Sequence, residues 1–120
     1  MNFLNKNILL CVTGGIAAYK SAEIIRSFKK NGADVRVVMT ESAKEFITPL
    51  TLQAVSGNEI HDSLLDVKAE YAMGHIELAK WADIILIAPC TAETIAKITH
   101  GRADDLMGAI ILASKASVFI

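Results

Sequence analysis

A short apolar strand that runs directly into two glycines and then into a helix constrains this chain more than any other feature. The expected strand is Ile8–Val12, the glycines are Gly14 and Gly15, and the expected helix extends from Ile16 to Lys30. Glycine permits a sharp turn and a close backbone approach to a ligand, and the first amides of a helix have no intrahelical acceptors. The segment is therefore typical of a phosphate-binding turn. A tight strand-to-helix turn without a ligand is the simpler alternative.

The spacing after the first glycine argues against two familiar nucleotide sites. A dinucleotide fingerprint requires glycines where this chain has Ile16 and Tyr19. A P-loop requires a glycine directly before Lys20, and Tyr19 occupies that position. Helix-forming residues follow at once, which leaves no long loop for a triphosphate, so the turn favours the phosphate of a mononucleotide. Lys20 is expected to face solvent, because the inward helical face contains Ala17, Ser21, Ile24 and Phe28.

Strands and helices alternate along the chain, which predicts a parallel sheet with helices on both of its faces. The other expected strands are Val35–Met39, Ile84–Ile87 and Ser117–Ile120. The other expected helices are 41–47, 49–55, 75–81, 91–100 and 104–113, and residues 58–74 are expected to be mostly loop. The predicted fold class is therefore α/β, with a doubly wound parallel sheet.

Composition argues against several classes of function. Twelve basic and thirteen acidic residues give a net charge of −1, which does not suit a nucleic-acid or membrane-surface protein. No apolar run approaches the roughly 20 residues of a membrane span, and Met1–Lys6 does not resemble a signal peptide, so a cytoplasmic location is expected. Cys11 and Cys90 lack the spacing of a metal pair, and packing is the favoured role for both thiols.

Ligands of a doubly wound sheet collect at the carboxyl ends of its strands. Here the second expected strand is followed by Thr40 and Ser42, and the third by Thr91 and Thr94. Their hydroxyls can hydrogen-bond a phosphate or a heterocycle, and each can equally cap a helix. Glu41 is a candidate ribose ligand for an NAD site, an interpretation that the glycine spacing weakens.

The three histidines differ in their expected surroundings. His75 follows Gly74 and is expected to open a helix, where the neutral imidazole is favoured and can accept a proton near pH 7. A capping or surface role for His75 is the alternative. His100 closes an expected helix beside Gly101, where a cation suits the helix dipole, and His61 lies in the expected loop.

Four segments resemble the flavin-dependent cysteine decarboxylase family, and together they extend over nearly the whole chain. They are Gly14–Lys20, Thr48–Gly57, Met73–Asp83 and Ala88–Ala96. The resemblance is greatest to the members that convert 4′-phosphopantothenoylcysteine to 4′-phosphopantetheine in coenzyme A biosynthesis. It implies a flavodoxin-like, Rossmann-type fold of three layers, FMN as the cofactor, and a trimer-based homo-oligomer. Phosphopantothenoylcysteine synthetase is the implied protein partner.

The resemblance also assigns roles to residues of this chain. His75 matches the family's catalytic histidine and is the implied acid/base. Bound flavin takes two electrons from the substrate cysteine, which gives a thioaldehyde whose C=S group can accept the carbanion charge left by carbon dioxide. Glu93 replaces the family's usual asparagine, which changes one flavin contact. The residues implied to contact FMN are Gly14, Gly15 and Ile16, then Thr40 and Ser42, and finally Thr91, Ala92, Glu93 and Thr94.

The chain departs from the family pattern at its end. In the family, a substrate-binding Pro-Ala-Met-Asn motif and a lid with a reductive cysteine follow the last strand expected here. Residues 1–120 are therefore expected to be a flavoprotein domain truncated before both, with a C-terminally incomplete sheet and no turnover alone. Neither Cys11 nor Cys90 matches the lid cysteine. The apolar edge at Val118–Ile120 is expected to promote association.

Three functions stay open on the sequence alone. The first is the decarboxylase or a fragment of it. The second is an FMN-binding module without turnover, either an electron carrier or half of a site that another chain completes. The third is a related enzyme, such as a peptidyl-cysteine decarboxylase or a flavin prenyltransferase. The segment Gly74–Leu78 favours the first.

Overall fold

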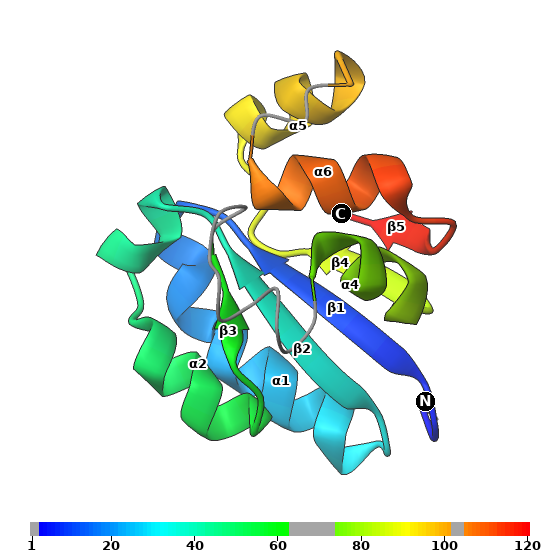
Figure 1. Ribbon diagram of the computed structural model, residues 1–120. Helices are drawn as coiled ribbons and strands as arrows, with labels where there is room; N and C mark the ends of the chain where they lie inside the picture. Colours follow the sequence, from blue (N-terminus) through cyan, green and yellow to red (C-terminus); the bar gives the residue numbers. More distant parts are fainter. Residues whose placement is uncertain (1–2, 63–73, 102–104) are drawn as a thin grey trace.

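The computed structural model describes residues 3–62, 74–101 and 105–120, which fold around a parallel sheet (Figure 1). The sheet has five strands in the order β3-β2-β1-β4-β5. They are β1 (Asn7–Val12), β2 (Asp34–Met39), β3 (Ile60–His61), β4 (Ile84–Ile87) and β5 (Ser117–Phe119). The predicted α/β class with a parallel sheet is confirmed.

The central position of β1 follows from its sequence. Each residue from Ile8 to Val12 is fully buried, as expected of a parallel strand that is covered on both faces. Ile8 pairs with Val35 of β2 on one side and with Ile84 of β4 on the other. The strand order therefore changes direction at β1, and the carboxyl ends of β1 and β4 flank the switch point where ligands of such sheets bind.

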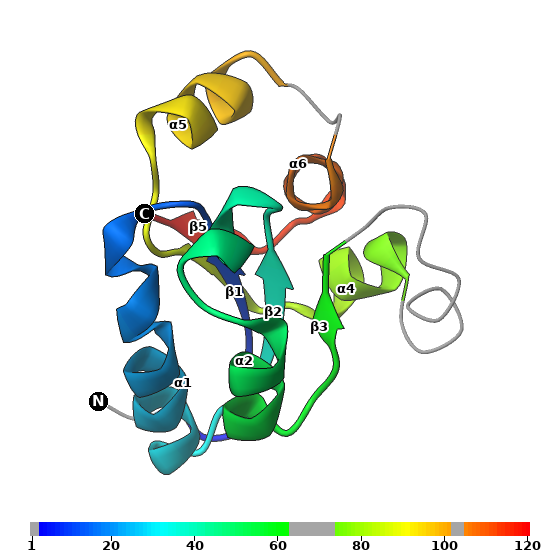
Figure 2. The same ribbon diagram turned by 90° about the vertical axis from the view of Figure 1, so that its left-hand side faces the viewer.

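Helices cover both faces of the sheet and make a three-layer arrangement (Figure 2). One face packs against η1 (Ile16–Lys20), α1 (Ser21–Lys30) and α2 (Pro49–Ser56). The other face packs against α4 (His75–Trp81) and α6 (Leu106–Ala113). The short turn η2 (Ser42–Glu45) directly follows β2, and α5 (Ala92–Thr99) follows the loop after β4 and stands away from the sheet. Within the described ranges, no helix combines the length and the apolar character that crossing a membrane requires.

The boundaries of α2 follow from local chemistry that the sequence displays. The Thr48 side chain accepts a hydrogen bond from the amide of Thr51, and Pro49 occupies the first turn, where its missing N–H costs nothing. Gly57 caps the carboxyl end in a left-handed conformation with φ of 77°. The predicted start at Pro49 is confirmed, and the helix ends at Ser56, one residue beyond the predicted end at Val55.

The first helix differs from the expectation in its opening turn. η1 is a 3₁₀ helix, which has three residues per turn rather than 3.6. This tighter turn places Ala18 and Ser21 on the buried face and leaves Ala17 exposed. The prediction that Ala17 packs inward is therefore wrong, whereas the inward orientation of Ser21 is confirmed.

The region predicted to be mostly loop contains a strand. Residues Ile60 and His61 form β3, which pairs with β2, and His61 is buried. A run of two residues carries no periodic pattern, so the sequence could not reveal it. The last strand is consequently the fifth along the chain, and the remainder of the predicted loop through residue 73 lies outside the described residues. The predicted start of the final helix at residue 104 also lies outside them, and α6 begins at Leu106 with Asp105 as its cap.

An apolar groove of about 340 Å³ lies beside the edge strand β5. Its lining is formed by Phe3, Ile8, Phe28, Ile84, Leu86 and Phe119. Phe119 is 54% exposed there, and contiguous exposed apolar surface at a sheet edge favours association between molecules.

We therefore expect the 120-residue chain to self-associate and Phe119→Asp to reduce that association. The introduced charge would have to lose its hydration in the interface, which opposes contact. Sedimentation velocity across a concentration series measures the effect. Leu50→Asp is the matched control, because Leu50 is exposed on α2 and does not line the groove. An equal reduction by both variants would contradict the role of β5.

Candidate functional site

The glycine turn packs directly against the residues that follow β2. A Cβ atom added to Gly14 would lie 2.3 Å from the Ser42 Oγ and 3.0 Å from the Ser42 backbone carbon, so no side chain fits there. A Cβ atom added to Gly15 would first meet the Pro89 ring, at 3.4 Å. Neither glycine has a positive φ. The close approach of Ser42, first by its side chain and then by its backbone, rather than an unusual conformation, therefore explains Gly14.

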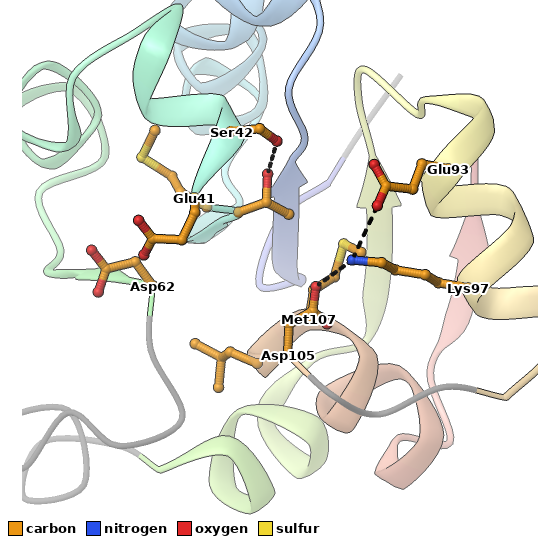
Figure 3. Close-up of a pocket in the computed structure, with 10 residues that line it drawn as sticks. Glu41, Ser42, Asp62, Glu93, Lys97, Asp105 and Met107 are labelled. Carbon is orange, nitrogen blue, oxygen red and sulfur yellow. Dashed lines mark hydrogen bonds and ion pairs between the residues drawn. The ribbon is translucent and has the colours of Figure 1, made fainter.

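The predicted hydroxyls after β2 lie beside this turn. The Thr40 Oγ1 is 3.3 Å from the Ser42 Oγ, and it also accepts a longer hydrogen bond of 3.4 Å from the Ala43 amide. Ser42 is exposed, and Figure 3 shows its side chain among those that line a crevice beside the end of β2. Thr40 thus helps to cap η2, while Ser42 presents a hydroxyl next to the glycine turn.

The predicted hydroxyls after β4 act mainly as a helix cap. The Thr91 Oγ1 accepts a hydrogen bond of 3.2 Å from the Thr94 amide and lies 2.9 Å from the Thr94 Oγ1. Thr94 is buried, whereas Ala92 and Glu93 are exposed in the first turn of α5. The capping alternative therefore accounts for Thr91 and Thr94, and the side chain of Glu93 points into the crevice (Figure 3).

A crevice of about 330 Å³ opens between the end of β2 and the helices α5 and α6 (Figure 3). It brings together three of the predicted ligand residues, which are Thr40, Ser42 and Glu93. Gly14 adjoins it through its contact with Ser42, and Gly15 lies near Pro89 and Thr91. The rest of the lining is formed by Met39, Glu41, Asp62, Lys97, Asp105, Leu106 and Met107.

Two lysines balance part of the acidic charge around the crevice. Lys97 Nζ lies 3.8 Å from the Glu93 carboxylate and 3.6 Å from that of Asp105 (Figure 3). Lys44 Nζ lies 2.6 Å from the Asp62 carboxylate, and this hydrogen bond raises the pKa of Lys44. Lys97 and Asp105 were not predicted from the sequence as residues of the site. Glu93 and Lys97 are four residues apart in the sequence, a spacing that predicts an ion pair along a helix rather than a ligand-binding site.

His75 opens α4, as predicted, and Gly74 occupies the N-cap position. The imidazole is half-buried, and His75 is not among the residues that line the crevice. His100 is exposed at the carboxyl end of α5, and His61 is buried in β3.

Both cysteines carry free thiols whose pKa values are raised by burial. The pKa of Cys11 rises to about 12, with smaller contributions from the negative charges of Asp105 and Cys90. Thiols in this state are protonated near neutral pH and are poor nucleophiles. These surroundings agree with packing roles for Cys11 and Cys90.

We expect neither thiol to react rapidly with a disulfide reagent at pH 8 in the folded protein. The half-buried Cys90 should react more slowly than in denaturant, and Cys11 should react only on unfolding. Single-cysteine variants made by Cys11→Ala and Cys90→Ala separate the two rates. Because an unfolded thiol ionises near its ordinary pKa of 9.0 and folded Cys11 only near 12, the free energy of unfolding should fall as pH rises across that interval. Fast labelling of Cys11 in the native protein would contradict this assignment.

The fold and the crevice define a doubly wound α/β protein with a glycine turn at its switch point and the hydroxyls of Thr40 and Ser42 beside that turn. Residues 2–118 match the model of the family described as Flavoprotein, and the chain belongs to that family.

The chain is similar to two bacterial proteins named Coenzyme A biosynthesis bifunctional protein CoaBC. It is 58% identical over 120 residues to the one from Haemophilus influenzae and 44% identical over 116 residues to the one from Bacillus subtilis. These matches include 100% and 97% of this chain. The chain spans only 30% and 29% of the two relatives' own lengths.

Solved structures confirm the flavodoxin-like fold. The FMN-dependent cysteine decarboxylase SpaF has a TM-score of 0.84 and 30% identity, over 94% of this chain and 65% of its own. A mutant PPC decarboxylase complexed with pantothenoylaminoethenethiol has a TM-score of 0.74 and 31% identity, over 92% of this chain and 62% of its own.

Proposed function

We propose that residues 1–120 belong to the FMN-binding domain of a decarboxylase that converts 4′-phosphopantothenoylcysteine to 4′-phosphopantetheine. The observation that carries this proposal is the packing of Gly14 against Ser42 at the switch point, in a chain that is 58% identical to a CoaBC protein. The identities to the FMN-dependent cysteine decarboxylase SpaF and to the PPC decarboxylase are lower, at 30% and 31%.

The residues of the turn fit the phosphate end of FMN. Gly14 has no room for a side chain, and the Ser42 and Thr40 hydroxyls lie beside it. A phosphate there would meet hydroxyl donors and backbone at the amino end of η1, which are suitable partners for an anion. Gly15 and Ile16 complete this group in the proposal. The start of α5, with Thr91, Ala92, Glu93 and Thr94, would hold the flavin ring system.

Charge is balanced in the same way at the two ends of the proposed site. The wall beside α5 carries Glu93 and Asp105 with Lys97 between them, and the wall beside Ser42 carries Glu41 and Asp62 with Lys44 between them. The glycine turn, rather than charge, therefore supports placing the phosphate beside Ser42 and the ring system beside α5. The ion pair with Lys97 also partly offsets the charge that Glu93 brings to a position where the family usually has asparagine.

FMN supplies a two-electron acceptor, which makes decarboxylation of a cysteine derivative feasible. The contribution of this chain is to bind the cofactor and to provide an acid/base. His75 has that role in the proposal, because it opens α4 and matches the catalytic histidine of the family that the sequence resembles, and an imidazole can serve as a general acid/base. His75 does not line the crevice described above, so the proposal requires the reacting end of the substrate to lie outside that crevice, close to α4.

The proposed partners follow from the longer relatives. A phosphopantothenoylcysteine synthetase domain on the same polypeptide is proposed because those relatives are bifunctional proteins of more than three times this length. A trimer-based assembly and a cytoplasmic location, both expected from the sequence, belong to the same proposal.

A non-catalytic FMN-binding module is the second candidate, and the position of His75 outside the crevice favours it. One experiment separates the two. Residues 1–120 and the complete gene product are purified, released flavin is identified by chromatography, and each is incubated anaerobically with 4′-phosphopantothenoylcysteine. We expect FMN in both preparations, with carbon dioxide and 4′-phosphopantetheine formed by the complete protein. FMN binding by the complete protein without turnover would favour the non-catalytic module, and absence of flavin from both would reject both candidates.

A further inference from the structure

Thr13 joins the two loops that flank the switch point. It directly follows β1 and is only 1% exposed, and its side-chain hydroxyl donates a hydrogen bond to the carbonyl oxygen of Pro89 in the loop after β4. The Thr13 carbonyl also accepts a hydrogen bond of 3.0 Å from the Gly15 amide. One residue therefore holds the glycine turn through its backbone and the opposite loop through its side chain.

The hydrogen bond from Thr13 to Pro89 lies just beyond the last backbone hydrogen bond between β1 and β4. The backbone bond from the Ala88 amide to the Cys11 carbonyl, 3.0 Å long, continues the β1–β4 pairing just beyond the ends of the paired strands. Past that point, the Thr13 hydroxyl provides a hydrogen bond between the diverging loops. A Cβ atom added to Gly15 would lie 3.4 Å from the Pro89 ring, so the two loops run close to each other there.

The hydroxyl of Thr13 is engaged with protein and is buried, so it does not line the crevice. Its effect on a ligand must therefore be indirect. We propose that Thr13 is a positioning residue that fixes the glycine turn relative to the start of α5, and so sets the spacing between the phosphate end and the ring end of the FMN site. This inference rests on the FMN binding proposed above.

Substitution by valine isolates the hydrogen bond, because valine has nearly the shape of threonine and lacks the donor. The Pro89 carbonyl would lose its buried partner, and the two loops would be free to separate. Since FMN contacts both loops in the proposed site, we expect Thr13→Val to weaken FMN binding by about tenfold, the size of effect that one lost buried hydrogen bond produces. Thr13→Ser retains the hydroxyl and should stay within about twofold of the wild type.

The test uses the complete gene product, with the dissociation constant for FMN measured by fluorescence quenching and the thermal unfolding of the apoprotein measured in parallel. Thr48→Val is the matched control, because it removes the Thr48 hydroxyl from the cap of α2, outside the crevice lining. We expect it to lower the unfolding temperature without changing FMN affinity. Thr13→Ala also removes the hydroxyl, and it replaces the valine variant if that variant does not fold.

The outcomes separate this inference from the proposed function. Weaker binding by Thr13→Val with recovery in Thr13→Ser supports the positioning role. Wild-type affinity in Thr13→Val, or failure of Thr13→Ser to recover affinity, overturns the positioning role and leaves the FMN site intact. A wild-type protein that does not bind FMN overturns both. An equal loss of FMN affinity in Thr48→Val would show that the effect is only structural and would also overturn the positioning role.

Discussion

Gly14→Asp is expected to abolish FMN binding. The new Cβ atom would fall 2.3 Å from the Ser42 Oγ and 3.0 Å from its backbone carbon, so the turn and the end of β2 would have to move apart. The carboxylate would in addition repel a phosphate held at the start of the helix. We expect at least a hundredfold loss of affinity, equivalent to about 3 kcal/mol. Flavin absorbance of the purified variant and titration with added FMN measure it.

Two further variants distinguish a lost ligand site from a lost fold. Gly15→Ala introduces only a contact of 3.4 Å with the Pro89 ring, so it should retain most of the FMN affinity. Adding Ser42→Gly to Gly14→Ala removes the two side-chain atoms that clash and leaves only the contact of 3.0 Å with the backbone carbon, so it should recover part of the thermal stability. If Gly14→Asp were purified with a full complement of FMN, the phosphate would not bind at this turn.

His75→Asn is expected to retain FMN and to lose decarboxylation. Asparagine has a similar size and can still form hydrogen bonds at the start of α4, but it cannot accept a proton near neutral pH. We expect a reduction in kcat of about 10²–10⁴-fold in the complete gene product, the usual contribution of a general acid/base. Anaerobic assays of carbon dioxide release, with bound flavin quantified in the same preparation, test both halves of the prediction.

His100→Asn is the matched control for this experiment, because His100 is exposed at the end of α5 and has no role in the proposed site. It should leave both FMN content and turnover near the wild-type values. If His75→Asn lost FMN and activity together, His75 would be a structural residue of α4 rather than the acid/base.

The parts of the fold that could be predicted are those in which local chemistry and packing agree. The uninterrupted apolar run of β1 predicts a buried parallel strand, and Thr48, Pro49 and Gly57 mark both ends of α2 without reference to the rest of the chain. β3 could not be predicted, because its two residues depend on pairing with β2 for their conformation. The inward orientation of Ala17 was wrongly predicted for a similar reason. The spacing of apolar residues does not reveal that η1 is a 3₁₀ helix rather than an α-helix.

The candidate site could be predicted only in part for a related reason. The glycine turn is continuous in sequence, and its role follows from residue type and order. The crevice wall that contains Lys97 and Asp105 forms only when α5 and α6 approach each other, and neither residue belongs to a local motif for ligand binding. Thr91 and Thr94, in contrast, do form a local pattern that suits a ligand. Helix capping already accounts for their hydroxyls, so the pattern alone does not identify a binding site.

The central place of β1 also has a consequence for synthesis of the protein. One of its neighbours, β2, begins at Asp34, but the other, β4, begins only at Ile84. At the usual translation rate of about 5–20 residues per second, the ribosome needs roughly 4–14 s after completing β1 to reach β4. During that interval β1, whose residues from Ile8 to Val12 are all buried in the folded protein, has an unpaired edge. Nascent chains of this protein should therefore depend on a chaperone that shields β1 until its second neighbour emerges.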